Sequence, residues 1–129
     1  MPPSSPALWL LDAARHGRRP ALIHAGAVVP YAGLLGETAR RAALLEAAGP
    51  RAPGPLAVIT RRAEHRYWSL LVALFRGLPL LPLPADLPPP SRARLLTDSG
   101  AALLSGDAAL LADHPGECPG LDDAWLRGD

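Results

Sequence analysis

The apolar residues of this chain fall into runs of strand length and stripes of helical spacing, separated by glycine and proline. Residues 56–60, Leu-Ala-Val-Ile-Thr, form a continuous apolar run, which is typical of a strand covered on both faces. Leu80–Leu83 and Ala102–Ser105 predict two more strands of this kind, and the prolines near the first of them favour an edge position. Two shorter β-prone pieces, Ala21–Ile23 and Ala27–Val29, indicate a small hairpin.

Helical patterns separate these strands. Residues 32–48 are dominated by Ala, Leu, Glu and Arg, which are good helix formers, and Gly49 and Pro50 end the pattern. The apolar stripe of this helix is expected to lie opposite Glu37, Arg40 and Arg41. A second helix is predicted over residues 64–76, with Gly77 as its stop. Its expected buried side consists of Tyr67, Leu70, Leu71, Leu74 and Phe75.

A third helix is predicted after Pro88–Pro90, with Ser91 as the N-cap and Gly100 just beyond the end. One or two helical turns follow over residues 108–112. Strand, helix, strand, helix, strand with short connections predicts an α/β fold, in which helices pack on a mainly parallel sheet built from βαβ units. Residues 7–129 are expected to form a single α/β subdomain that starts with a short helix over residues 7–16. Residues 1–6 are expected to be a flexible lead-in.

The length and composition of the chain exclude several classes of function. The 129 residues suffice for about one domain, which excludes a multidomain enzyme within this chain. Acidic and basic residues are mixed and the net charge is +1, so neither nucleic acid nor a membrane is an expected partner. The chain has no lysine, and arginine cannot replace a lysine of tunable pKa. The single cysteine, Cys118, and the lack of a secretory leader favour a cytoplasmic location.

Few side chains suggest chemistry. The four histidines lack the spacing of a metal site, and the aspartates sit where caps and turns are expected. Arg61 and Arg62 follow the first buried strand, at the edge where parallel sheets bind ligands, but solvated charges are the favoured interpretation. Trp68 and its aromatic neighbours are expected in the core or an interface. No phosphate loop, dinucleotide fingerprint or nucleophile elbow occurs. No catalytic, cofactor-binding or metal-binding residue is therefore assigned.

Taken in order, four stretches resemble the N-terminal region of the adenylate-forming superfamily, which includes acyl-CoA synthetases, luciferases and adenylation domains of nonribosomal peptide synthetases. The match covers about residues 7–105, which is most of the chain. The strongest match is Leu74-Phe-Arg-Gly-Leu-Pro-Leu-Leu-Pro-Leu83, which is similar to the second core motif of that family, and residues 88–99 follow it without a gap. Residues 29–35 are similar to its tyrosine-containing first core motif. Residues 19–23 and 56–60 look like its early strands.

Three positions depart from the family pattern. Gly33 replaces an acidic residue, Pro84 stands where peptide synthetases usually have Asp, and Ser91 stands at a usual Arg, with Arg92 and Arg94 nearby. These departures indicate a divergent member. The matching motifs are structural in the family, so no catalytic residue is carried over.

The resemblance implies a piece of a ligase that activates a carboxylate or amino acid with ATP and magnesium. The family's phosphate loop, ribose-binding Asp and catalytic Lys have no counterpart here, so the chain is expected to bind no cofactor alone. It is expected to be completed by another chain, as in a split enzyme, or by further sequence of a truncated protein, and otherwise to self-associate. A non-catalytic adenylation-like scaffold in a biosynthetic assembly is the main alternative, and a free-standing nucleotide binder is a third.

Overall fold

The structure of the chain is a computed structural model that describes residues 20–24, 27–49, 54–114 and 118–127. Its elements, in chain order, are β1 (Pro20–His24), β2 (Ala27–Pro30), α2 (Tyr31–Ala48), β3 (Leu56–Ile59), α3 (Ala63–Arg76), β4 (Leu80–Leu83), α4 (Pro89–Ser99), β5 (Leu103–Gly106), α5 (Ala108–Leu111), β6 (Gly120–Leu121) and the 3₁₀ helix η2 (Asp123–Arg127). The expected lead-in over residues 1–6 and the short helix over residues 7–16 lie outside the described residues.

The central sheet has four strands in the order β4-β3-β5-β6, and every neighbouring pair is parallel. This confirms the predicted α/β fold class. β3 lies inside the sheet and is buried along its whole length, as the continuous apolar run predicts. β4 lies at the edge, where the missing backbone N–H of Pro82 costs no ladder hydrogen bond. The two-residue strand β6 was not predicted, because so short a piece has no pattern of its own.

Each face of the sheet carries its own hydrophobic cluster, because successive strand residues point to opposite faces. On one face, Leu56 and Leu103 pack with apolar residues of α2, α3 and η2. On the other face, Ala57, Ile59 and Leu104 pack with Leu96 of α4 and with the partly buried leucines of α5. The parallel strands are thus covered on both faces, which is the usual condition for a parallel sheet.

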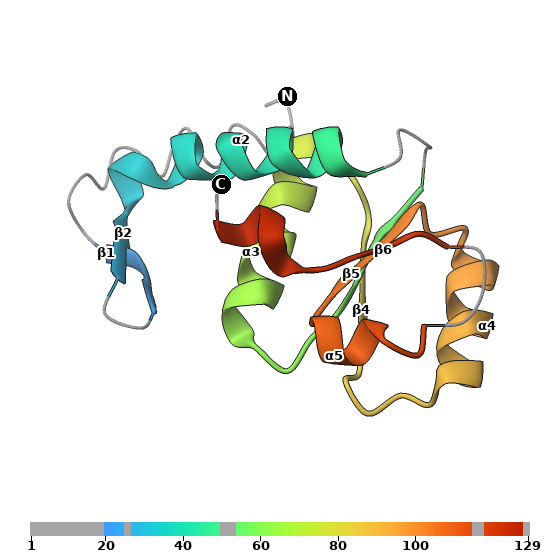
Figure 1. Ribbon diagram of the computed structural model, residues 1–129. Helices are drawn as coiled ribbons and strands as arrows, with labels where there is room; N and C mark the ends of the chain where they lie inside the picture. Colours follow the sequence, from blue (N-terminus) through green and yellow to red (C-terminus); the bar gives the residue numbers. More distant parts are fainter. Residues whose placement is uncertain (1–19, 25–26, 50–53, 115–117, 128–129) are drawn as a thin grey trace, which may run out of the picture.

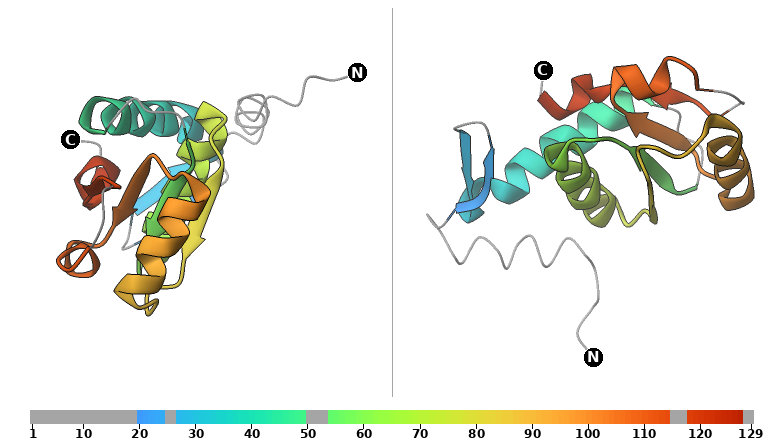
Figure 2. Two further views of the ribbon diagram at one scale, coloured as in Figure 1. Left: turned by 90° about the vertical axis from the view of Figure 1, so that its right-hand side faces the viewer. Right: turned by 90° about the horizontal axis from the view of Figure 1, so that it is seen from below.

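The hairpin of β1 and β2 stands apart from this sheet. Its two strands pair antiparallel, as predicted, and form a separate two-stranded sheet. Figures 1 and 2 show it at one end of α2, while α4 lies at the opposite end of the molecule. The main part of the protein therefore consists of the four-stranded sheet and the helices that cover it.

The predicted buried side of α3 is partly wrong. Leu71 is buried, but Leu70 and Leu74 are 43% and 37% exposed. His65, Trp68, Ser69, Val72 and Ala73 face the core instead. Apolar residues occupy almost every position from 67 to 75, so periodicity does not select a face, and the contacts with α2 and β3 decide it. The helix ends at Gly77 as predicted, with a left-handed φ of 70°.

Two local predictions about helices α2 and α4 are also corrected. Arg41 lies in the core and not on the exposed side of α2. α4 begins at Pro89 after Pro88, so Ser91 lies inside its first turn and is not the N-cap. Proline suits this position because its fixed φ matches the helix and its missing N–H would have no partner there. Gly100 ends α4 as predicted, with a left-handed φ of 68°.

None of the helices in the described part of the chain is both long enough and apolar enough to cross a membrane.

Candidate functional site

The carboxyl ends of β3 and β5 form the place where a parallel sheet of this topology would bind a ligand. The connection after β3 leads to β4 on one side of the sheet, and the connection after β5 leads to β6 on the other side. Such a reversal opens a crevice between the two central strands, beyond their carboxyl ends. Thr60 and Arg61 follow β3, and Asp107 follows β5, so these three residues meet there.

The Asp107 carboxylate lies between the carboxyl ends of β3 and β5. Its Oδ1 accepts a hydrogen bond of 2.6 Å from the Thr60 hydroxyl, and its Oδ2 accepts one of 2.9 Å from the backbone N–H of Arg61. Asp107 is the N-cap residue of α5, as predicted, but its side chain makes no capping hydrogen bond. The carboxylate instead joins the ends of two neighbouring strands.

A close contact and two hydrogen bonds lead inward from this carboxylate. The Nδ1 atom of His65 lies 3.5 Å from Asp107 Oδ1, and its Nε2 atom lies 2.8 Å from Ser105 Oγ. Ser105 Oγ also accepts a hydrogen bond of 2.9 Å from the indole Nε1–H of Trp125. Because the Trp125 indole can only donate, the Ser105 hydroxyl oxygen accepts from it. The Ser105 hydroxyl then donates its own hydrogen to His65 Nε2, and the hydrogen on His65 Nδ1 faces Asp107.

Serine, histidine and aspartate in this order resemble a nucleophilic triad, but the surroundings oppose that chemistry. The side chains of His65 and Ser105 are fully buried. Ser105 lies within β5, paired with Val58 of β3 and Leu121 of β6, so its backbone N–H belongs to a ladder and no oxyanion site adjoins it. The arrangement therefore joins α3, β5, η2 and the end of β3, and serves the fold.

The ionisation of the two titratable groups follows from their surroundings. Burial lowers the pKa of His65 below its ordinary value of 6.5, although the Asp107 carboxylate opposes the shift. Burial alone would raise the pKa of Asp107, but the hydrogen bonds from Arg61 and Thr60 and the nearby His65 bring it below its ordinary value of 3.8. At neutral pH the pair is a neutral imidazole beside a carboxylate.

Arg61 and Arg62 are exposed, as expected of solvated charges, but Arg62 also forms ion pairs. Its guanidinium contacts the carboxylates of Asp123 in η2 and Glu64 in α3. Arg61 contributes only its backbone N–H to the crevice. The sequence places both arginines at this edge but gives no sign of their partners, which are distant in the chain or belong to the backbone.

Other predicted features lie away from the crevice. Trp68 is buried, and the Arg41 guanidinium lies 3.9 Å from its ring centroid. Cys118 is a free cysteine, and burial raises the pKa of its thiol, which lowers its reactivity. Among the residues that the structure describes, no group of three or more His, Cys, Asp or Glu side chains could hold a metal ion.

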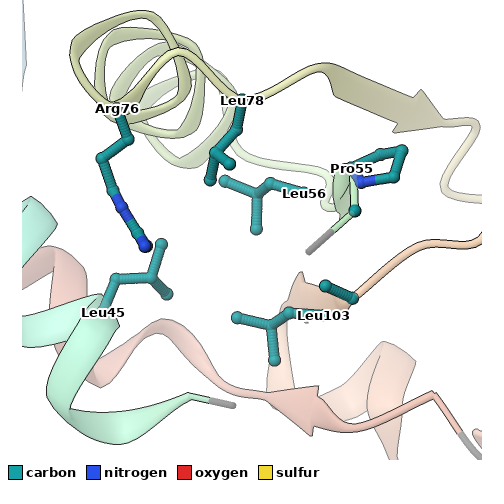
Figure 3. Close-up of a pocket in the computed structure, with 8 residues that line it drawn as sticks. Leu45, Pro55, Leu56, Arg76, Leu78 and Leu103 are labelled. Carbon is teal, nitrogen blue, oxygen red and sulfur yellow. The ribbon is translucent and has the colours of Figure 1, made fainter. Parts of the chain in front are cut away.

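A small pocket of about 30 Å³ lies at the amino end of the sheet, on the far side from the crevice. The side chains around it are apolar apart from Arg76, which extends along one side of the pocket toward Leu45 in Figure 3. Its lining residues are Leu45, Gly54, Pro55, Leu56, Arg76, Leu78, Ala102 and Leu103. This volume matches about one water molecule, so the pocket is too small for a substrate or nucleotide.

The crevice does not fit the phosphates of the ATP that the sequence resemblance implies. The Thr60 hydroxyl and the Arg61 backbone N–H could bind a phosphate, but both already donate to the Asp107 carboxylate. A second anion beside it would be repelled. We therefore derive no nucleotide chemistry from this edge of the sheet.

Substitution of Asp107 by asparagine is expected to lower the free energy of unfolding at pH 7 by about 1–3 kcal/mol, because two hydrogen bonds lose their charged acceptor. The lowered pKa of Asp107 gives stability that is present above the ordinary value of 3.8 and is lost as the pH falls through the folded-state pKa. The variant should therefore also show a shallower loss of stability below about pH 4 in urea titrations. Asp113→Asn, at an exposed carboxylate, is the control; an equal effect there would contradict the role of Asp107.

No protein-family model matches the sequence, and no curated protein matches it either. Solved structures do match in three dimensions. The fold is similar to a fused adenylation and carrier-protein didomain of a nonribosomal peptide synthetase from Klebsiella oxytoca, NpsA-ThdA, with a TM-score of 0.78 and 21% identity over 95% of this chain and 23% of that chain. It is also similar to the separate N-terminal subdomain of NpsA, with a TM-score of 0.75 and 22% identity over 93% of this chain and 32% of that chain.

O-succinylbenzoate coenzyme A synthetase from Bacillus subtilis, MenE, gives a TM-score of 0.78 and 25% identity over 92% of this chain and 26% of that chain. The chain thus spans less than a third of the length of each of these structures. The likeness confirms that the chain has the α/β fold found in the N-terminal subdomains of adenylate-forming enzymes.

Proposed function

We propose that this chain is the N-terminal α/β layer of an adenylate-forming ligase, which activates a carboxylate or amino acid with ATP, and that it is inactive alone. The observation that carries the proposal is the match of fold over 92% or more of the chain to adenylation and acyl-CoA synthetase structures. The sequence supports it independently, because the two core motifs of the resemblance fall on the start of α2 and on the turn from α3 into β4.

Catalytic groups must then come from outside these 129 residues. The chain has no lysine, and the Thr60 and Arg61 donors at the end of β3 are bound to the Asp107 carboxylate. ATP, magnesium and the acid would bind to loops supplied by a second chain or by further sequence. The role of this layer is to support those loops. We place the activity in the cytoplasm, in agreement with the lone cysteine thiol.

Exposed leucines indicate where the rest of the enzyme would pack. Leu70 and Leu74 are one helical turn apart on the outer side of α3, and Leu95 is 41% exposed on α4. Exposed apolar side chains grouped on one helix face are a common mark of an interface. A partner layer that covers Leu70 and Leu74 would complete the enzyme; without it, these leucines favour self-association.

ATP–pyrophosphate exchange tests the proposal. The 129-residue chain alone is expected to show no exchange, and a mixture with the polypeptide that carries the phosphate loop and catalytic lysine is expected to show it. Leu70→Gln combined with Leu74→Gln should reduce exchange by the mixture about tenfold or more, as loss of a central apolar contact does in other interfaces. Ala43→Gln, on the exposed side of α2, is the matched control. Exchange by the chain alone, or none from a mixture of folded partners, would overturn the proposal.

A non-catalytic scaffold is the second candidate, and the position of Asp107 at the end of β3, together with Gly33 and Pro84, favours it. A scaffold needs its outer surface but not the family's motif residues. Purification of the chain with its partner distinguishes the two functions. A partner that retains full exchange activity after this chain is removed would identify a scaffold, whereas loss of exchange would identify a ligase layer.

A further inference from the structure

η2 is held on the sheet by polar contacts at three points. Arg41 Nε donates a hydrogen bond of 2.7 Å to the carbonyl of Leu126, Arg62 pairs with Asp123, and the Trp125 indole donates to Ser105. Trp125 and Leu126 are each 3% exposed, so η2 closes one face of the core. In Figure 1 it lies beneath α2, against the helices that cover this face.

Ser105 connects one of these contacts to a group that can take up a proton. Its hydroxyl lies between the Trp125 indole, which can only donate, and His65 Nε2. Neutral His65 accepts the hydroxyl hydrogen, so both contacts are satisfied at once. A protonated His65 would donate from Nε2, and the hydroxyl hydrogen would then lose the acceptor that it has in this structure, at a fully buried position. A buried polar hydrogen without an acceptor costs free energy that only rearrangement can relieve.

We propose that protonation of His65 weakens the Trp125–Ser105 contact and loosens η2, so that the docking of this element is sensitive to acid. The Trp125 indole and the His65 imidazole also pack edge to face, with 6.1 Å between the ring centroids. Movement of Trp125 would therefore admit water to the charged ring. This inference does not depend on the adenylate-forming function.

The charges around His65 shift its pKa in both directions. Asp107 after β5 and Asp123 on η2 favour the imidazolium, and Arg62 before α3 disfavours it. Arg41 on α2 is directed to Trp68 and Leu126 instead. Burial outweighs these attractions and keeps the pKa of docked His65 below 6.5. The free energy that favours docking of η2 is therefore largest above pH 6.5. It falls as the pH drops below 6.5, until the pH reaches the pKa of His65 in the docked state.

Hydrogen exchange of the Trp125 indole tests the inference in the ¹⁵N-labelled 129-residue chain, with Trp125→Phe to identify the resonance. After correction for intrinsic exchange, the equilibrium constant for opening of η2 is expected to increase about tenfold for each pH unit below 6.5. The reason is that His65 takes up one proton when η2 opens. His65→Gln should abolish this pH dependence. Opening that does not change between pH 8 and 5, or that changes equally in His65→Gln, would overturn the inference.

Two more variants keep the test decisive if His65→Gln does not fold. Ser105→Ala removes the connecting hydroxyl, so the pH dependence of the indole should become smaller while the ring of His65 still titrates. Arg41→Lys removes the Nε contact to Leu126 and should increase opening by a constant factor at every pH. An unchanged pH dependence in Ser105→Ala would count against the connection through Ser105. A changed one in Arg41→Lys would show that any weakening of η2 produces the effect.

Discussion

Replacing Trp125 with alanine is expected to lower the free energy of unfolding by about 3–5 kcal/mol, the range for removing a buried large aromatic side chain. The indole is 3% exposed and packs in the cluster formed by α2, α3 and η2. Its loss also leaves the Ser105 hydroxyl with one partner fewer in the core. Urea denaturation followed by circular dichroism measures the change.

Trp125→Phe is the matched control. It keeps most of the apolar contact and removes the indole N–H, so a loss of about 1–2 kcal/mol is expected, as for a single buried hydrogen bond and a small volume change. A loss below about 1 kcal/mol for Trp125→Ala would show that η2 is not part of the folded core, since large-to-small substitutions in cores cost more. The same result would also weaken the inferred link to His65.

Replacing Gly106 with alanine is expected to destabilise the centre of the sheet by about 1–3 kcal/mol or more, as overpacking of a well-packed core does. A Cβ atom at this position would lie 2.7 Å from the carbonyl oxygen of Ile59 and 2.8 Å from its Cγ2. Ile59 belongs to β3, which is paired with β5 on one side and β4 on the other, so its backbone has little room to move. Thermal and urea unfolding of the variant measure the loss.

Gly36→Ala tests whether any added methyl group is harmful. Gly36 lies within α2, and a Cβ atom there would meet no atom within 4 Å. Alanine is the better helix former, so this variant should gain about 0.5–1 kcal/mol. Opposite signs for the two variants would support the close approach of β5 to β3. A neutral Gly106→Ala would show that the sheet adjusts more easily than its geometry indicates.

The order of the helices and strands was predictable from the local sequence, because helix stops and apolar runs each involve only a few neighbouring residues. Gly77 and Gly100 stop their helices where predicted, since glycine adopts a left-handed φ without steric cost. The apolar run at 56–59 became the buried central strand, and Leu80–Leu83 became the edge strand. The same stretches carry the resemblance to adenylate-forming enzymes, whose fold the comparison of structures confirmed.

The candidate site was not predictable in this way. Asp107 meets Thr60 across 47 positions, and His65 meets Ser105 across 40. The aspartate resembles an ordinary helix cap in the sequence, and the histidine lies in a helix whose apolar residues are on all sides. A single sequence gives no sign that these polar groups share one buried network.

The sequence by itself determined the fold class, the residues at which helices end and the family resemblance, because these depend on backbone preferences and on runs of apolar residues. Only the tertiary structure decided which side of α3 is buried, that Arg41 contacts η2, and that Asp107 joins the ends of β3 and β5. Periodicity fixes the spacing of side chains along a helix, but the rotation of that helix depends on its neighbours. A polar group can be buried only where a partner is brought to it, and folding alone brings partners from distant parts of the chain.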